Sequence, residues 1–287
     1  MHSQIYFDYN ATTPCTKEVV DSMLPYFYQN FGNPSSSHHA YGWLAKSAVE
    51  DATLSISRNL GVSPKSIVYT SGSTESINMV LKGIARKMLS KGNHIITTKA
   101  EHKAVLDTCA FLEEDGFEVT YLDVDSKGLI SIDMLNKTLR PETILVSILY
   151  ANNETGTIQP LDEISKLIHE NGSLLFSDTT QALGKVDLSK IFQLVDFACF
   201  SAHKIYGPKG IGLVFIKDNE DENGLPSFIQ GGGQQRKQRG GTINTPLIVG
   251  FSKAIELANE NFHVETERLK TLRNKLETGL LKIDLAI

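Results

Sequence analysis

FACFSAHKIYGPKGIGLVFI, residues 197–216, joins two apolar runs through a loop rich in glycine. The runs 197–202 and 211–216 are short and apolar throughout, which is typical of strands that are buried on both faces of a sheet. His203 and Lys204 stand side by side where the first run ends, and Lys209 follows in the turn GPKG. If a lysine has a special chemical role at this point, Lys204 and Lys209 are the two candidates.

The rest of the chain alternates in the same way. Short β-branched runs predict further strands at 67–70, 94–98, 119–123, 143–150 and 173–178. Helical patterns lie between most of them, at 74–90, 103–114, 131–139 and 160–171, and a longer one covers about 247–282. Strands that alternate with helices of this length indicate an α/β fold, with a mostly parallel sheet covered by helices.

Composition limits the class of protein. The 287 residues suffice for one large domain, or one large and one partial domain, and 41% hydrophobic with 21% charged residues is ordinary for a globular enzyme. A formal charge of −5 argues against nucleic acid or an anionic membrane as the partner, and no apolar run is long enough to span a bilayer. The N-terminus lacks a secretion signal, and three widely spaced cysteines suit a reducing compartment, so we expect a cytoplasmic protein.

Polar side chains follow five of the predicted strands. The strand ends are followed by SGSTES, KAEHK, ANNETG, DTTQ and SAHK. Because ligands of parallel α/β sheets bind at the carboxyl ends of the strands, we expect these segments to form one site.

The first of these segments has two interpretations. Ser71-Gly72-Ser73-Thr74 between a strand and a helix would bind a phosphate through free backbone N–H groups at the helix N-terminus. The same residues also suit an ordinary Ser/Thr N-cap with Glu75 in the first turn. The segment lacks the lysine of a Walker loop, and a GxGxxG pattern is absent, which disfavours ATP and NAD.

Other candidates carry nitrogen and carboxylate chemistry. Asp178 and Gln181 follow a buried strand, and Asp178 could hold a heteroaromatic nitrogen protonated through a charge-assisted hydrogen bond. His102 suits a base, a metal ligand or a ring that stacks on a cofactor, although a lone histidine more often serves structure. Its spacing from His38, His39 and His203 resembles no zinc motif, so we predict no metal.

Lys204 completes a recognisable set of groups. A lysine that is partly desolvated beside an imidazole has a lowered pKa and can form an imine. Lys209 is better explained as a solvated lysine of the turn. An imine-forming Lys204, a pyridine partner at Asp178 and phosphate donors at Thr74, Ser201 and His203 together predict pyridoxal 5′-phosphate as the cofactor.

The motifs also resemble a known family. FDYNATTP, FGNPSSSHHAYG, TSGSTESIN, EHKAV, NNETGTIQP, SDTTQALGKV, FSAHKIYGPKGIG and GGGQQRKQRGGT run in order from residue 7 to about residue 245. Together they are similar to the cysteine desulfurases, in the class V aminotransferase group of fold-type I pyridoxal phosphate enzymes. The resemblance implies a homodimer that removes sulfur from L-cysteine, leaves L-alanine, and serves iron–sulfur cluster or thio-cofactor assembly.

The resemblance also implies roles for single residues. Lys204 would carry the cofactor and His102 would stack on its ring, with a further acid/base role open. Asp178 would bind the pyridine nitrogen, Gln181 the phenolic oxygen, and Asn153 would lie near that oxygen and the substrate. The phosphate would be held by Ser73, Thr74, Ser201 and His203, and by Thr242 from the other subunit.

One part of the family pattern is not found. The family's persulfide cysteine and the arginine that binds the substrate carboxylate lie in a C-terminal small domain, and Cys15, Cys109 and Cys199 match no persulfide position. We expect an N-terminal segment (1–15), a cofactor-binding large domain (16–258) and the start of an incomplete small domain (259–287). The partner would be an iron–sulfur scaffold or another sulfur acceptor. Two alternatives stay open: a catalytically incomplete cofactor-binding or dimerisation fragment, and another class V lyase or aminotransferase.

Overall fold

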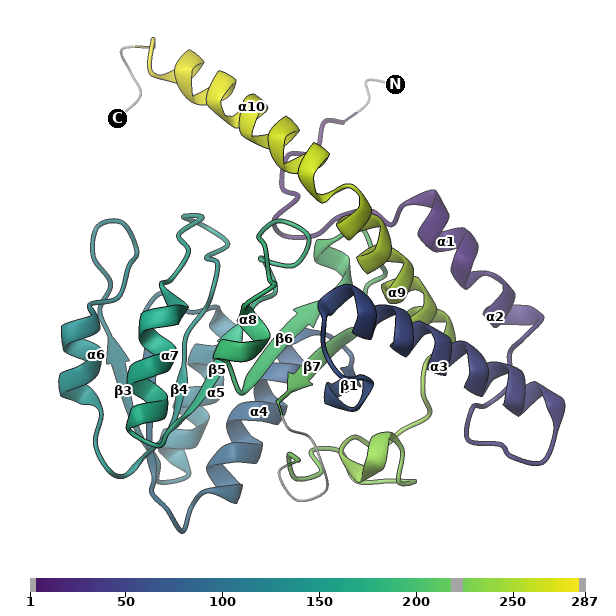
Figure 1. Cartoon of the computed structure of the whole chain (residues 1–287), viewed down its shortest axis with the longest axis horizontal. Coiled ribbons are helices and arrows are strands. Elements are labelled where there is room, and N and C mark those ends of the chain that lie inside the picture. The colour runs from purple at the N-terminus through teal and green to yellow at the C-terminus, as the bar shows by residue number, and fades with distance from the viewer. Residues whose placement is uncertain (1–3, 218–223, 284–287) are drawn as a thin grey trace.

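The computed structural model describes residues 4–217 and 224–283 (Figure 1). One seven-stranded sheet has the order β1-β7-β6-β5-β4-β2-β3. Its strands are β1 (Ile67–Thr70), β2 (His94–Thr98), β3 (Glu118–Leu122), β4 (Thr143–Ser147), β5 (Leu174–Asp178), β6 (Phe197–Ser201) and β7 (Gly212–Ile216). The strands from β6 to β3 pair in parallel, whereas β7 is antiparallel to both β1 and β6. The predicted α/β fold with a mostly parallel sheet is therefore confirmed.

The sheet lies between two layers of helices. Residues of α4 (Ser73–Lys87) and α5 (Lys103–Glu114) pack with Val68, Phe176 and Val214 on one face. On the other face, Leu175 and Phe200 pack with residues of several helices. These are α1 (Lys17–Met23), α3 (Ala40–Leu60), α6 (Ile132–Thr138), α7 (Leu161–Glu170), α8 (Ile191–Leu194) and α9 (Thr245–Glu260). Burial on both faces explains why β4, β6 and β7 are mainly apolar.

The long C-terminal helical pattern is two helices. Asn261 ends α9, and α10 (Phe262–Leu280) follows and extends away from the sheet (Figure 1). No residue of α10 is buried, and Leu269, Leu272 and Leu276 are exposed on it. The sequence therefore located this helical region but missed its break at Asn261.

Several elements of the N-terminal and loop regions were not predicted. They are α1, α2 (Pro25–Tyr28), α3, α8 and the short 3-10 turns Pro64–Ser66, Ala202–Lys204 and Gln235–Lys237. Among the described residues, no helix is long and apolar enough to cross a membrane.

Candidate functional site

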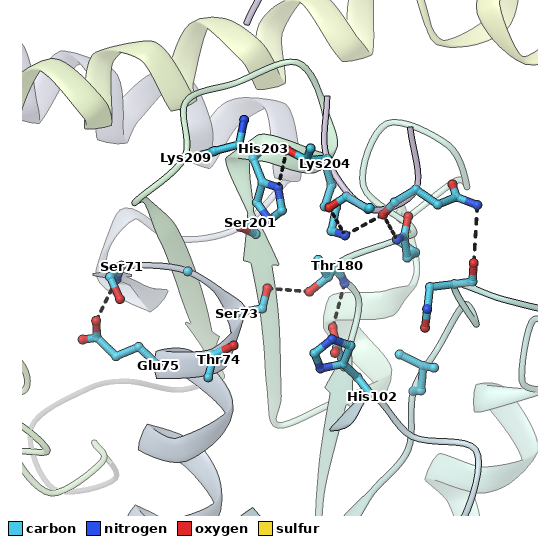
Figure 2. Close-up of a pocket in the computed structure, with 18 of the residues that line it drawn as sticks. Ser71, Ser73, Thr74, Glu75, His102, Thr180, Ser201, His203, Lys204 and Lys209 are labelled. Carbon is cyan, nitrogen blue, oxygen red and sulfur yellow. Dashed lines mark hydrogen bonds between the residues drawn. The ribbon is translucent and has the colours of Figure 1, made fainter. Parts of the chain in front are cut away.

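A cavity of about 890 Å³ opens at the carboxyl ends of the strands (Figure 2). Segments that follow β1, β2, β4, β5 and β6 all contribute to its lining, as the five polar strand ends predicted. Most of the predicted site residues line it: Ser73, Thr74, His102, Asn153, Asp178, Gln181, Ser201, His203 and Lys204. The parallel sheet brings them together because it places the carboxyl ends of these strands along one edge.

Thr242 lies elsewhere in the chain's own structure. It is exposed and lines a separate cavity of about 330 Å³, together with Tyr26, Phe31 and Gly32. This position is compatible with the sequence-based expectation that Thr242 serves the other subunit's phosphate, which stays a prediction.

The N-terminus of α4 forms one wall of the cavity. The backbone N–H groups of its first turn have no intrahelical partners, and its N-cap, Gly72, has no side chain that could cap them. Gly72 has φ 151, in the region that favours glycine, and a Cβ there would come within 3.7 Å of Ser201 Oγ. Ser73 Oγ lies 2.6 Å from Thr180 Oγ1, which lines the same cavity. The Ser/Thr cap interpretation is therefore wrong for this helix, and the free N–H groups suit an anion.

Glu75 lies in the same helical turn, where a free carboxylate would oppose an anion. Arg239 Nε donates to its Oε1 at 2.8 Å, and Ser71 N donates to Oε2 at 2.8 Å. Burial acts to raise the pKa of Glu75, but these hydrogen bonds and the arginine charge lower it overall. The arginine thus compensates the charge of Glu75 beside the anion site.

Asp178 ends β5 at the floor of the cavity and is only 3% exposed. Its Oδ1 accepts hydrogen bonds from Thr180 N at 3.0 Å and from Cys199 Sγ at 3.4 Å. A buried carboxylate with these neutral donors is completed by a cationic partner in the cavity. A protonated ring nitrogen is such a partner.

Lys204 lies in the short 3-10 turn after β6. Its Nζ donates to Asn10 O at 2.6 Å and to Ala11 O at 2.9 Å. Burial lowers the pKa of Lys204, while the charges of Asp178 and Asp8 act to raise it. A lysine with a lowered pKa has a larger neutral, nucleophilic fraction at neutral pH.

Lys209, which the sequence analysis explained as a solvated lysine of the turn, also lines the cavity. It is exposed, and in Figure 2 its amine points away from Ser73 and Thr180, whereas Lys204 is held by two carbonyl oxygens. The geometry therefore favours Lys204 over Lys209 as the reacting amine.

The N-terminal segment forms a cover that sequence reasoning missed. Thr13 N donates to His203 O at 2.9 Å, and Thr12 Oγ1 lies 3.1 Å from His203 Nδ1. Burial, with the charges of Lys204 and Lys209, lowers the pKa of His203 to about 4, so this imidazole is neutral at pH 7. The motif FDYNATTP was the available signal, but nothing local in it indicates contacts with residues about 190 positions away.

The remaining candidates complete the wall. His102 is the N-cap of α5, accepting from Ala104 N through Nδ1 at 3.1 Å, and its ring is exposed to the cavity (Figure 2). Gln181 Nε2 donates to Asn10 O at 3.0 Å, and Asn153 O accepts from Asn10 Nδ2 at 3.4 Å. No cluster of three or more potential metal ligands occurs among the described residues.

These groups fit pyridoxal 5′-phosphate. Uncapped N–H groups with Ser73, Thr74 and Ser201 suit its phosphate, Asp178 suits its ring nitrogen, and Lys204 suits its aldehyde. The site thus has a chemically matching residue for the phosphate, the ring nitrogen and the aldehyde that the sequence analysis assigned.

Comparisons with known proteins agree with this site. A sequence model of the aminotransferase class-V family matches residues 5–286. The chain is 47% identical over 280 residues to a cysteine desulfurase IscS of Anaeromyxobacter sp. (strain Fw109-5), covering 98% of this chain and 69% of that relative. It is 44% identical over 285 residues to the IscS of Dechloromonas aromatica (strain RCB), covering 99% and 70%.

Solved structures give the same picture. A NifS-like protein superposes with a TM-score of 0.92 at 40% identity, over 98% of this chain and 76% of that one. SspA in complex with cysteine superposes with a TM-score of 0.84 at 42% identity, over 88% and 72%. The chain spans about 70% of the length of the two IscS relatives.

Proposed function

The chain belongs to the class V aminotransferase family, and within it to the pyridoxal 5′-phosphate-dependent cysteine desulfurases, and from this premise we propose which residues perform the chemistry. Lys204 binds the cofactor aldehyde, and Asp178 holds the ring nitrogen protonated. Ser73, Thr74, Ser201 and His203 hold the phosphate with the first turn of α4. His102 stacks on the ring, Gln181 donates to the phenolic oxygen, and Asn153 lies near that oxygen and the substrate.

When bound, the cofactor serves as an electron sink for the Cα of an amino acid. The protein's residues make this possible in separate ways. Asp178 stabilises positive charge at the ring nitrogen, and the lowered pKa of Lys204 makes its amine available as nucleophile and then as proton carrier. His102, exposed in the cavity, is placed to move a proton at the substrate.

One observation carries this proposal: Lys204 and Asp178 line the same cavity, at the ends of adjacent parallel strands, opposite an uncapped helix N-terminus. We expect the purified protein to be yellow, with a visible absorbance band that borohydride bleaches. Peptide mapping should then find the pyridoxyl group on Lys204. Finding it on Lys209 would contradict the assignment, and full cofactor loading without any adduct would contradict the mechanism.

L-Cysteine is the proposed substrate. The 42% identical structural relative SspA is described in complex with cysteine. In this chain, the cavity extends from Lys204 to His102 and Asn153, so polar groups face the place where an amino acid would join the cofactor. Formation of L-alanine from L-cysteine separates a desulfurase from another class V lyase or aminotransferase.

A homodimer is supported by an aromatic surface near Thr242. Phe27, Tyr28, Phe31, Tyr41 and Trp43 are each more than half exposed. Phe31 lines the same small cavity as Thr242. Exposed apolar patches of this kind mark protein interfaces. We propose that a second copy docks on this surface and that Thr242 then serves the partner's phosphate site. Sedimentation velocity of a Trp43→Glu variant, which should be monomeric, tests the interface.

We keep the domain division at residues 258 and 259 as a proposal, with an iron–sulfur scaffold or another sulfur acceptor as the downstream partner. The boundary falls near the end of α9, and the exposed leucines of α10 support a further apolar contact for the second part.

A further inference from the structure

Lys185 lies outside the cavity described above, at a second cavity of about 780 Å³ on the other side of Lys204. Its Nζ donates to Gln181 Oε1 at 2.6 Å. Among the described residues, no carboxylate forms an ion pair with Lys185. The amide oxygen of Gln181 is therefore the partner that explains where this lysine lies.

A continuous set of hydrogen bonds connects Lys185 to Lys204. Gln181 Nε2 donates to Asn10 O at 3.0 Å, and Lys204 Nζ donates to the same oxygen at 2.6 Å. Gln181 is 9% exposed, so its amide is fixed by these contacts more than by solvent. Lys185 thus contacts Gln181 directly, and Gln181 lines the cofactor cavity.

The surroundings of Lys185 are unfavourable to its charge. The Lys185 side chain is exposed at the second cavity. Desolvation by the surrounding protein atoms, together with the charge of Lys204, nevertheless lowers the pKa of Lys185 to about 8. The other titratable groups of that cavity are Tyr9, Glu18, Lys204, Tyr206, Glu265 and Arg268. A partly desolvated lysine without an ion pair contributes little to folding stability. Its hydrogen bond to Gln181 is therefore the feature that suggests a role for Lys185.

Protonated lysine fixes the direction of the amide because its ammonium group has only donors. A glutamine amide can turn over and offer either its oxygen or its NH₂ group. With Lys185 donating to Oε1, the NH₂ group must face Asn10 and the cavity. Gln181 then acts there as a hydrogen-bond donor, which suits an acceptor such as an anionic oxygen.

We propose that Lys185 is a positioning residue that holds the Gln181 amide with its NH₂ group toward the cofactor's phenolic oxygen. This inference rests on the proposed function. Lys185 touches neither substrate nor cofactor and acts through Gln181.

The test is the pH titration of the visible absorbance band of the cofactor-loaded protein. A hydrogen bond donated to an anionic oxygen stabilises the deprotonated form. Removal of this hydrogen bond should therefore raise the pH midpoint of the titration. In Lys185→Met we expect a rise of about one pH unit, the size that fits one hydrogen bond to a charged group. Lys185→Arg keeps a donor and should titrate near the wild type. Lys190→Met, an exposed lysine that lines neither cavity, is the matched control.

A double-mutant cycle shows whether the effect passes through Gln181. In a Gln181→Leu background, Lys185→Met should shift the midpoint little further. An unchanged midpoint in Lys185→Met alone, or an equal shift in the Gln181→Leu background, would overturn the proposal. A wild-type protein with no visible band would instead contradict the proposed function, so the two failures are distinguishable.

Discussion

Two buried carboxyl groups at the strand ends have different surroundings. Asp178 accepts hydrogen bonds from Thr180 and Cys199 and faces the cavity. Glu101 Oε1 accepts from Leu149 N at 2.7 Å and from Thr98 Oγ1 at 3.1 Å, whereas Oε2 is buried without a partner. Burial, with the charge of Asp178, raises the pKa of Glu101 to about 8. Glu101 is therefore a neutral acid at pH 7 that ties the loop before His102 to the end of β4.

Replacing Asp178 tests the ring-nitrogen partner. Asp178→Ala should slow exchange of the Cα proton of a bound amino acid at least tenfold, because a charge-assisted hydrogen bond contributes about 1.5–3 kcal/mol. Cofactor retention should fall less, since the phosphate contacts remain. Deuterium uptake at Cα, followed by NMR, measures the first effect, and equilibrium dialysis the second. Unchanged exchange would mean that Asp178 does not act on the ring nitrogen.

Replacing Glu101 tests a pH dependence of stability. Glu101 stays protonated in the folded protein up to a pKa of about 8, whereas it ionises near pH 4.5 when unfolded. Folding therefore takes up a proton in this range, and the contribution of Glu101 to stability falls as the pH rises from about 4.5 to about 8. Glu101→Gln cannot ionise, so it should gain stability relative to the wild type, on the order of a few kcal/mol, between pH 5 and pH 8.

Thermal unfolding midpoints at several pH values measure this difference. Glu114→Gln, an exposed glutamate at the end of α5, is the control and should show no such trend. If wild type and Glu101→Gln followed parallel curves from pH 5 to pH 8, Glu101 would not be held neutral.

At the scale of elements, the site depends on close contact between β7, β6 and α4. Gly212 begins β7, where a Cβ would come within 2.5 Å of Phe200 O and 2.7 Å of Gly72 Cα. The antiparallel pairing of β6 and β7 and the phosphate-binding end of α4 therefore share one crowded point.

Gly212→Ala should disturb both stability and cofactor binding. Both contacts are with backbone, so we expect a loss of about 1–3 kcal/mol in the free energy of unfolding, as for other overpacked sites. The affinity for pyridoxal phosphate should also fall, because Gly72 precedes the first turn of α4. Denaturant unfolding and equilibrium dialysis measure the two effects. Gly279→Ala in α10, where an added Cβ meets nothing within 4 Å, is the control. A Gly212→Ala protein with wild-type stability and affinity would contradict this expectation and show that β7 can move to accommodate the added Cβ.

At the scale of the whole molecule, none of the three cysteines lines the cofactor cavity. Cys109 in α5 and Cys199 in β6 are 0% exposed. Burial raises the pKa of each, and the pKa of Cys15 is raised as well. Sulfur transfer needs a mobile thiolate near the substrate.

We therefore predict that the 287-residue chain binds pyridoxal phosphate but releases little or no sulfide from L-cysteine. Replacing all three cysteines with serine should leave any residual rate unchanged, as measured by sulfide and alanine assays. A robust rate that disappears with one replacement would show that this chain has its own persulfide site.

The sequence by itself determined the α/β class and the residues of the main strands. The runs 67–70 and 94–98 are β1 and β2 without change of bounds, because their β-branched residues favour strands and every residue of both strands is buried. The polar residues that interrupt these runs marked the strand ends. Parallel strands bring their carboxyl ends to one edge of the sheet. The polar strand ends therefore predicted that Lys204, Asp178 and His102 lie near one another, and all three line one cavity.

Only the tertiary structure decided the contacts between distant segments. Helix α3 buries the small residues Ala45, Ala48 and Ala52, which give a weak apolar pattern. The antiparallel direction of β7, the cover of Asn10 over Lys204 and the contact of Lys185 with Gln181 depend on how the folded chain packs. Periodicity records whether a residue is buried. Which partner meets it is fixed by packing and hydrogen bonding across the whole fold.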